Sequence, residues 1–404
     1  MAKRKSFVLM LLALCLSLLC GCGGGTADSS KDNGLLLYLS FDEGIGAKVE
    51  DRSGHLDTAD VSYQYTHAVY MEDQDPQWRG SGIENGSLLF DGASTYISYK
   101  AEEIAVAGPE FSVSIWAAPR AFEWDDPEAA ANGRANLTAI VGQYNKDKKQ
   151  GFLLGYERYG RLCFEVGTGD DWYAVWADRN LSSYALNYIT AVFDGGNGKI
   201  TVYLNGTLAA ERDIPAGSEI SPADRERLMV GKNAHAGQIA AGAYNMFCGM
   251  MDELKLYSRA LTRDEAQPPA IPEINYDDIS LENILTGDEF KTQFHGGPYQ
   301  HWMNEPHATV YYNGTYHLFF QQNIVGTYWR NICWGHLVSP DLVRWKPVRE
   351  AITATENSVV PDGVWSGNAA YDVNGVPLLF FTAGNDSLPA FSPCRFPHNV
   401  QDAQ

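Results

Sequence analysis

Residues 111–116 read Phe-Ser-Val-Ser-Ile-Trp, and this stretch decides the fold because apolar and polar side chains alternate along it. A period of two puts Phe111, Val113 and Ile115 on one face of a β-strand. The same period recurs at residues 35–41 and 200–204, and no useful helical period competes across 34–257. We therefore expect an all-β fold in which two antiparallel sheets pack face to face.

Composition limits the size class and the partners. The chain has 404 residues, which suits two or three domains rather than one core. It carries 30 Lys and Arg against 50 Asp and Glu, a formal net charge of −20. Nucleic acid is excluded as an expected partner, because binding it requires a basic surface.

The N-terminal segment predicts where the protein resides. Three basic residues at 3–5 precede an apolar run over 7–19, which is too short to span a bilayer comfortably and is typical of a secretory signal. Residues 19–22, Leu-Cys-Gly-Cys, resemble the lipobox of bacterial lipoproteins, with Cys22 as the lipidation site. We expect a signal peptide over 1–22, a flexible tether over 23–33, and a lipid-anchored, extracytoplasmic protein of the bacterial cell envelope. The alternative is a plain signal peptide cleaved nearby.

Four cysteines remain after this segment, and their wide spacing makes a zinc site improbable. In an exported protein one disulfide, Cys163 to Cys248, is possible, and buried free thiols are the equal alternative. The other two cysteines are Cys333 and Cys394.

Five blocks of the first half resemble the laminin-G/concanavalin-A-like jelly roll. They lie at 39–44, 51–54, 89–92, 111–116 and 249–257, so we assign this sandwich to residues 34–257. The resemblance implies a fold more than a function, since such sandwiches bind sugar, bind calcium or act as spacers.

Two candidate sites within the sandwich stay open. The first is a structural calcium site, for which turn and cap roles are the alternative. Its carboxylates would be Asp51, Asp91, Asp252 and Glu253. The second is a sugar platform, for which core packing is the alternative. Its rings would be Trp124, Trp172 and Trp176.

A Pro-rich linker is predicted over 258–289, followed by a second β region over 290–404. Asn313-Gly314 and Asn374-Gly375 each separate two apolar alternating runs, which is a strong hairpin signal. Two similar hairpins about 60 residues apart indicate blades of a β-propeller.

Four blocks of this second region resemble glycoside hydrolase family 32, the fructan-cleaving five-bladed propellers. They are Trp-Met-Asn-Glu-Pro at 302–306, Tyr-His-Leu-Phe-Phe-Gln at 316–321, the Trp-Gly-His block at 334–345 and Asp-Gly-Val-Trp-Ser-Gly-Asn-Ala at 362–369. The resemblance implies the N-terminal part of an incomplete five-bladed propeller.

The same resemblance implies the roles of individual residues. Glu305, which stands where the family has Asp, would be the nucleophile of a retaining glycosidase. The alternative for Glu305 is a carboxylate that caps the turn before Pro306. The implied lining of the fructosyl pocket is Asn304, Gln321, Trp329, Trp365 and Ser366.

We therefore expect an enzyme that hydrolyses β-fructofuranosyl linkages in sucrose or fructans without a cofactor or catalytic metal. The family's R-D-P and E-C motifs, which would supply a stabilising Asp and the acid/base Glu, do not occur in these residues. From this we expect a fragment that is inactive or impaired as it stands. Two alternatives stay open: a surface-anchored carbohydrate-binding lipoprotein without catalysis, and an arabinose-cleaving propeller, against which the block at 365–369 weighs.

Overall fold

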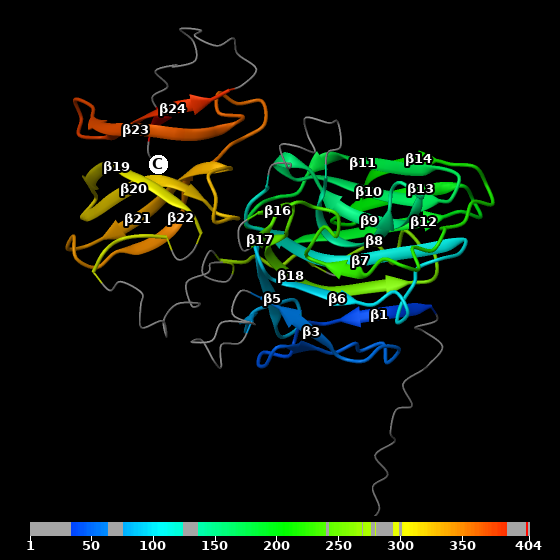
Figure 1. Cartoon of the computed structure of the whole chain (residues 1–404). Helices are drawn as coiled ribbons and strands as arrows, with labels where there is room; N and C mark the ends of the chain where they lie inside the picture. The colour runs from blue at the N-terminus through cyan, green and yellow to red at the C-terminus, as the bar shows by residue number, and fades with distance from the viewer. Residues whose placement is uncertain are drawn as a thin grey trace, which may run out of the picture. The chain divides into compact units, whose positions relative to one another are not determined.

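Antiparallel strands dominate the protein (Figure 1). The structure is a computed structural model that describes residues 34–63, 76–123, 136–239, 242–268, 270–275, 279, 294–298, 301–385 and 401–402. The predicted signal peptide and tether, with Cys22, lie outside these ranges, as do Trp124 and Cys394. No helix that could cross a bilayer occurs within the described ranges.

The first half of the chain forms two sheets of eight strands each. The first sheet has the order β14-β13-β12-β7-β18-β5-β4, with β1 on β18. Its strands are β1 (Leu35–Leu39), β4 (Gln77–Arg79), β5 (Ser87–Asp91), β7 (Glu110–Pro119), β12 (Asn187–Asp194), β13 (Lys199–Leu204), β14 (Thr207–Asp213) and β18 (Cys248–Tyr257).

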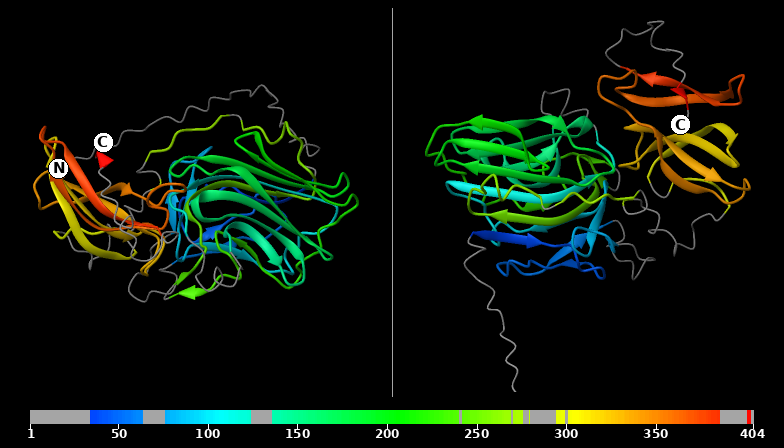
Figure 2. Two further views of the ribbon diagram at one scale, coloured as in Figure 1. Left: turned by 90° about the horizontal axis from the view of Figure 1, so that it is seen from above. Right: turned by 180° about the vertical axis from the view of Figure 1, so that it is seen from behind.

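The second sheet has the order β11-β10-β9-β8-β15-β6-β3-β2. Its strands are β2 (Lys48–Val49), β3 (Ala59–Ser62), β6 (Tyr96–Tyr99), β8 (Thr138–Asn145), β9 (Gln150–Tyr156), β10 (Arg161–Thr168), β11 (Trp172–Asn180) and β15 (Leu228–Val230). A 3-10 turn, η1 (Arg158–Gly160), joins β9 to β10, and a small hairpin pairs β16 (Gln238–Ile239) with β17 (Gly242–Ala243). Figure 2 shows these sheets from two further directions.

The core lies between the two sheets, as the alternation predicts. Phe111 on β7 is fully buried, and its ring centroid lies 4.5 Å from that of Phe152 on β9 of the other sheet. The polar side chain between Phe111 and Val113 is also buried, because the segment after β18 covers it: Ser112 Oγ donates to the Arg259 carbonyl at 2.8 Å. The prediction of an all-β sandwich is therefore confirmed.

The second half forms two further antiparallel sheets. One contains β19 (Met303–Tyr312), β20 (Thr315–Asn323), β21 (Ile332–Ser339) and β22 (Lys346–Ile352); the other contains β23 (Gly363–Tyr371), β24 (Pro377–Gly384) and β25 (Gln401–Asp402). Asn313 and Gly314 form the turn between β19 and β20 with φ values of 49° and 84°, which a two-residue hairpin turn requires. These sheets agree with the expected blades.

A buried indole joins these two sheets. Trp334 on β21 packs against Phe381 of β24 at a centroid distance of 6.1 Å, and Gly367 on β23 makes room for it. A Cβ at position 367 would overlap the indole. Contacts within Gly34–Gln404 are dense enough that these residues form one unit.

The cysteines correct one expectation. Cys163, Cys248 and Cys333 are buried free thiols, so the alternative of a Cys163–Cys248 disulfide is wrong. The physical reason is that the two side chains belong to different apolar clusters. Cys163 packs with Leu137 and Leu153, whereas Cys248 packs with residues that include Cys333.

Candidate active site

Three of the predicted site residues meet in one hydrogen-bonded cluster, although they come from three strands. Glu305 lies on β19, Gln321 on β20 and Ser366 on β23. Gln321 Nε2 donates to Glu305 Oε1 at 2.7 Å and to Ser366 Oγ at 3.1 Å. The Ser366 hydroxyl donates to the same Glu305 oxygen. We call Glu305, Gln321 and Ser366 the carboxylate cluster.

A break in the pairing of β19 with β20 places the carboxylate. Asn304 pairs with Gln321 and Pro306 pairs with Phe320, so Glu305 is an extra residue between two paired positions. Such a bulge turns a side chain away from regular alternation and is frequent beside active sites. It brings the Glu305 side chain toward that of Gln321, the residue that pairs with Asn304.

The environment of the cluster is asymmetric. Gln321 is buried, with 4% of its surface exposed, whereas Glu305 and Ser366 are exposed. A buried amide is a rigid donor, and a hydrogen bond to a charged acceptor is roughly twice as strong as one between neutral groups. In the described part of the chain both donors bind Oε1, so neither of them holds Oε2. The arrangement fixes a carboxylate while leaving its second oxygen available to an incoming electrophile.

The other three predicted residues do not join this cluster. Asn304 is exposed and faces Gln321 only through strand pairing. The Trp365 carbonyl accepts a 2.7 Å hydrogen bond from Trp334 Nε1, and its ring is half-buried. Trp329 lies in the β20–β21 loop with 58% of its surface exposed. Among the described residues, the structure gives none of these side chains a contact with Glu305.

His307, two residues after Glu305, lies outside the set of predicted site residues. Its ring packs on that of Trp334 at a centroid distance of 4.4 Å, and burial lowers its pKa while the charge of Glu305 opposes that shift. Both ring nitrogens are buried. Spacing could not have indicated this residue, because the bulge at Glu305 interrupts the alternation of faces along β19.

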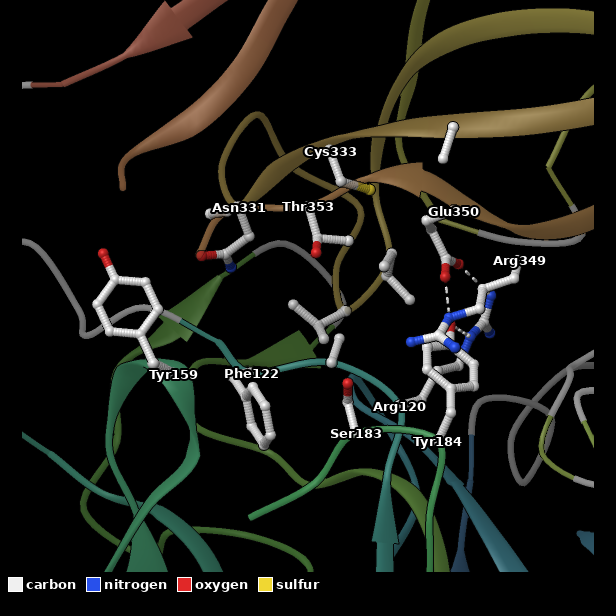
Figure 3. Close-up of a pocket in the computed structure, with 15 residues that line it drawn as sticks. Arg120, Phe122, Tyr159, Ser183, Tyr184, Asn331, Cys333, Arg349, Glu350 and Thr353 are labelled. Carbon is white, nitrogen blue, oxygen red and sulfur yellow. Dashed lines mark hydrogen bonds and ion pairs between the residues drawn. The ribbon is translucent and has the colours of Figure 1, made fainter. Parts of the chain in front are cut away.

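A separate cavity of about 370 Å³ contains none of the predicted site residues. Arg120 and Tyr184, from the first half of the chain, line it together with Glu350 on β22 (Figure 3). Arg120 Nη2 lies 3.0 Å from Glu350 Oε1, and the Tyr184 hydroxyl donates to the other oxygen of that carboxylate. Arg120 and Glu350 therefore neutralise each other and are not part of the carboxylate cluster.

Two of the four carboxylates considered for calcium hold local backbone. Asp51 accepts hydrogen bonds from the backbone N–H groups of Tyr38 and Leu56, and Asp91 accepts them from residues 93–95. No three His, Cys, Asp or Glu side chains gather as a metal site within the part of the chain that the structure describes. The half-buried Trp172 and Trp176 pack on a small cluster around Leu153.

Comparisons with known proteins agree with both resemblances. Residues 295–393 match the family described as "Glycosyl hydrolases family 32 N-terminal domain". Residues 91–267 match the "Concanavalin A-like lectin/glucanases superfamily".

Curated relatives match part of this chain. A "Beta-fructofuranosidase, insoluble isoenzyme 2" from Oryza sativa subsp. indica is 37% identical over 150 residues, which are 37% of this chain and 22% of that protein. A "Fructan 1-exohydrolase" from Hordeum vulgare is 38% identical over 113 residues, 28% of this chain and 19% of that protein. The chain thus spans about a fifth of the length of these relatives.

Among solved structures, fructan 1-exohydrolase IIa from Cichorium intybus is 34% identical, covers 24% of this chain and 18% of its own, and has a TM-score of 0.23. That overlap is too small for the superposition to add to the argument. The sequence matches show that residues 295–393 are similar to the N-terminal domain of glycosyl hydrolase family 32, and that residues 91–267 are similar to concanavalin-A-like domains.

Proposed function

We propose that the protein is a retaining glycosidase that cleaves β-fructofuranosyl linkages in sucrose or fructans. The observation that carries the proposal is the carboxylate cluster, in which a buried amide and a hydroxyl hold one oxygen of Glu305. The matches to β-fructofuranosidase and fructan 1-exohydrolase support the same substrate class.

In the proposed reaction, Glu305 attacks C2 of the fructosyl unit. The bond from C2 to the leaving oxygen breaks, that oxygen takes a proton from an acid, and a covalent fructosyl ester forms on Glu305. Water then cleaves the ester and releases fructose. Gln321 and Ser366 would keep the carboxylate oriented, and positioning of this kind contributes strongly to rate.

The first test is fructose release from sucrose, levan and inulin, together with the mass of the acid-quenched protein. In the form of the protein that releases fructose, we expect an adduct of one fructosyl residue, and after Glu305→Gln we expect neither adduct nor release. Glu356→Gln, which changes an exposed carboxylate in the same half of the chain, is the matched control. Activity that survives Glu305→Gln would exclude this nucleophile.

The two hydrogen-bond donors to Glu305 in the described ranges are an amide and a hydroxyl, and neither is an acid. The group that protonates the leaving oxygen therefore needs a test of its own. Reading the coding DNA past codon 404 in all frames for R-D-P and E-C motifs provides it. If both motifs are missing and no form of the protein releases fructose, a carbohydrate-binding protein without catalysis becomes the better proposal.

We also propose that Cys22 carries a lipid and anchors the protein to the bacterial envelope. The support is the sequence Leu19-Cys20-Gly21-Cys22 after a short apolar run. Metabolic labelling with a palmitate analogue should label the native protein, and Cys22→Ala should abolish the label. Cys20→Ala is the control, because that residue would leave with the signal peptide.

A further inference from the structure

We propose that the sandwich positions the β20–β21 loop, residues 324–331, and that Tyr328 is the residue through which it does so. This loop carries Trp329, the exposed indole expected beside the fructosyl unit. A role of this loop in catalysis rests on the proposed function. The positioning of the loop by the sandwich does not.

The anchor is a buried carboxyl group of the sandwich. Glu123 is only 2% exposed, and its Oε1 accepts a hydrogen bond from the Tyr328 hydroxyl. Its Oε2 accepts one from the backbone N–H of Asn245, so the acceptor is held from its other side. The ring of Tyr244 meets that of Tyr328 edge to face at 5.2 Å. Tyr328 therefore fits a site built by two separate segments of the sandwich.

The loop backbone is shaped to deliver Tyr328 to this site. The Gly326 carbonyl accepts a 3.0 Å hydrogen bond from the Trp302 N–H, and Asn323 Nδ2 donates to the Tyr328 carbonyl at 2.9 Å. The Tyr328 ring folds back over Gly326, where any Cβ would overlap it. Glycine at position 326 is thus a steric requirement for this conformation.

An apolar contact holds the start of the loop. Ile324 and Val325 pack with Cys333 of β21 and with Cys248 and Ala121 of the sandwich. Ile324 and Val325 are 5% and 2% exposed, so both side chains are removed from water. The loop is consequently fixed at two points, one apolar and one polar.

The position of Trp329 depends on how the loop is held. Tyr328 is half-buried against the sandwich, whereas the next residue is 58% exposed. Asn323 Nδ2 donates to the Tyr328 carbonyl, so the peptide that leads into Trp329 is positioned together with the Tyr328 side chain. Releasing Tyr328 should therefore move an indole that touches neither Glu123 nor Tyr244 among the described residues.

The experiment uses the full chain labelled with 5-fluorotryptophan and observed by fluorine NMR, with the Trp329 signal assigned by Trp329→Phe. Tyr328→Phe keeps the ring but removes the hydroxyl, and it should shift or broaden the Trp329 signal. Tyr159→Phe is the matched control, because its hydroxyl donates to the Pro361 carbonyl at 2.6 Å elsewhere between the two halves of the chain. Glu123→Gln keeps an acceptor and should preserve the signal, whereas Glu123→Leu should move it.

A titration with fructose separates this inference from the proposed function. If fructose shifts the native Trp329 signal, Tyr328→Phe should weaken its binding about two- to tenfold, the effect of one net hydrogen bond. If fructose has no effect but Tyr328→Phe still moves the signal, the positioning role stands and the proposed function fails. A Trp329 signal that is unchanged in both Tyr328→Phe and Glu123→Leu overturns the inference.

Discussion

Gln321 Nε2 and Glu305 Oε1 lie 2.7 Å apart, and the same amide nitrogen lies 3.1 Å from Ser366 Oγ. Gln321 therefore links the carboxylate on β19 to the hydroxyl on β23, while its own side chain is buried. An amide in this position orients Glu305 without competing with it for a proton.

Removing that amide should impair catalysis more than stability. In the form of the protein that releases fructose, we expect Gln321→Leu to lower kcat/KM about 10- to 100-fold, because a hydrogen bond to a charged group contributes ~1.5–3 kcal/mol. Initial rates of fructose release give the measurement. Gln150→Leu makes the same chemical change in the sandwich and should leave the rate unchanged. An unaltered kcat/KM in Gln321→Leu would show that this amide does not support the nucleophile.

Glu123 should make stability depend on pH. Burial raises its pKa from 4.5 to about 8, although Tyr328, the N–H groups of Asn245 and Met246, and Arg330 act in the opposite direction. Above pH 4.5 the unfolded chain loses this proton while the folded chain keeps it until about pH 8. The free energy of unfolding contributed by Glu123 therefore falls as the pH rises through that window.

Glu123→Gln removes this dependence, since an amide does not titrate. The stability of the variant relative to the native protein should improve steadily between about pH 5 and about pH 8, and then level off. Urea unfolding at several pH values measures the difference, with the exposed Glu102→Gln as control. A constant difference across the range would mean that Glu123 is ionised in the folded protein.

Gly367→Ala should destabilise the contact between the two blade sheets. The added methyl group would overlap the Phe380 carbonyl and the Trp334 indole, and overpacking of this kind costs ~1–3 kcal/mol. Gly297→Ala is the control, because the nearest atom to a Cβ there is Met303 Sδ at 3.9 Å. Urea midpoints that are equal for the two variants would contradict the close packing of Trp334.

The ion pair of Arg120 with Glu350 gives a third stability prediction. Their side chains are 5% and 2% exposed, so Arg120→Met leaves a buried carboxylate without its cation and should cost ~3–5 kcal/mol. Adding Glu350→Leu should restore much of the loss, because the unpaired charge is then gone. A double-mutant cycle from urea unfolding measures the coupling, and simple additivity of the two changes would refute it. Lys199→Met, at an exposed pair, should have a much smaller effect.

Local pattern was sufficient for much of the fold. Alternation at residues 111–116 predicted a strand with a buried face, and Asn313-Gly314 predicted the β19–β20 turn, because both signals depend on neighbours in the sequence. Alternation could not predict that Ser112 is buried as well. Ser112 is covered by the segment that contains Arg259, 147 positions away, and a contact at that distance has no counterpart in the local alternation of apolar and polar residues.

The candidate site, like the fold, could be predicted only in part. Glu305 and Ser366 are 61 positions apart, and only the order of the family motifs indicated that they would meet. The contacts that join the sandwich to the second half had no sequence signal, because Glu123 and Tyr328 lie outside the recognised motifs and are 205 positions apart. His307 could not be predicted for a different reason. Its packing against Trp334 depends on a bulge in β19, and the residue types in β19 do not indicate a bulge.

The Arg120–Glu350 pair also bears on how such a gene could evolve. If the first half of the chain had no contacts with the second half, recombination could replace it with another sugar-binding module with little loss of stability. Here a foreign module would leave the buried Glu350 carboxylate without a cation unless it placed a guanidinium at the same position. The two halves should therefore be inherited together, and their pairing should be harder to break by gene shuffling than a linker of 32 residues, 258–289, would suggest.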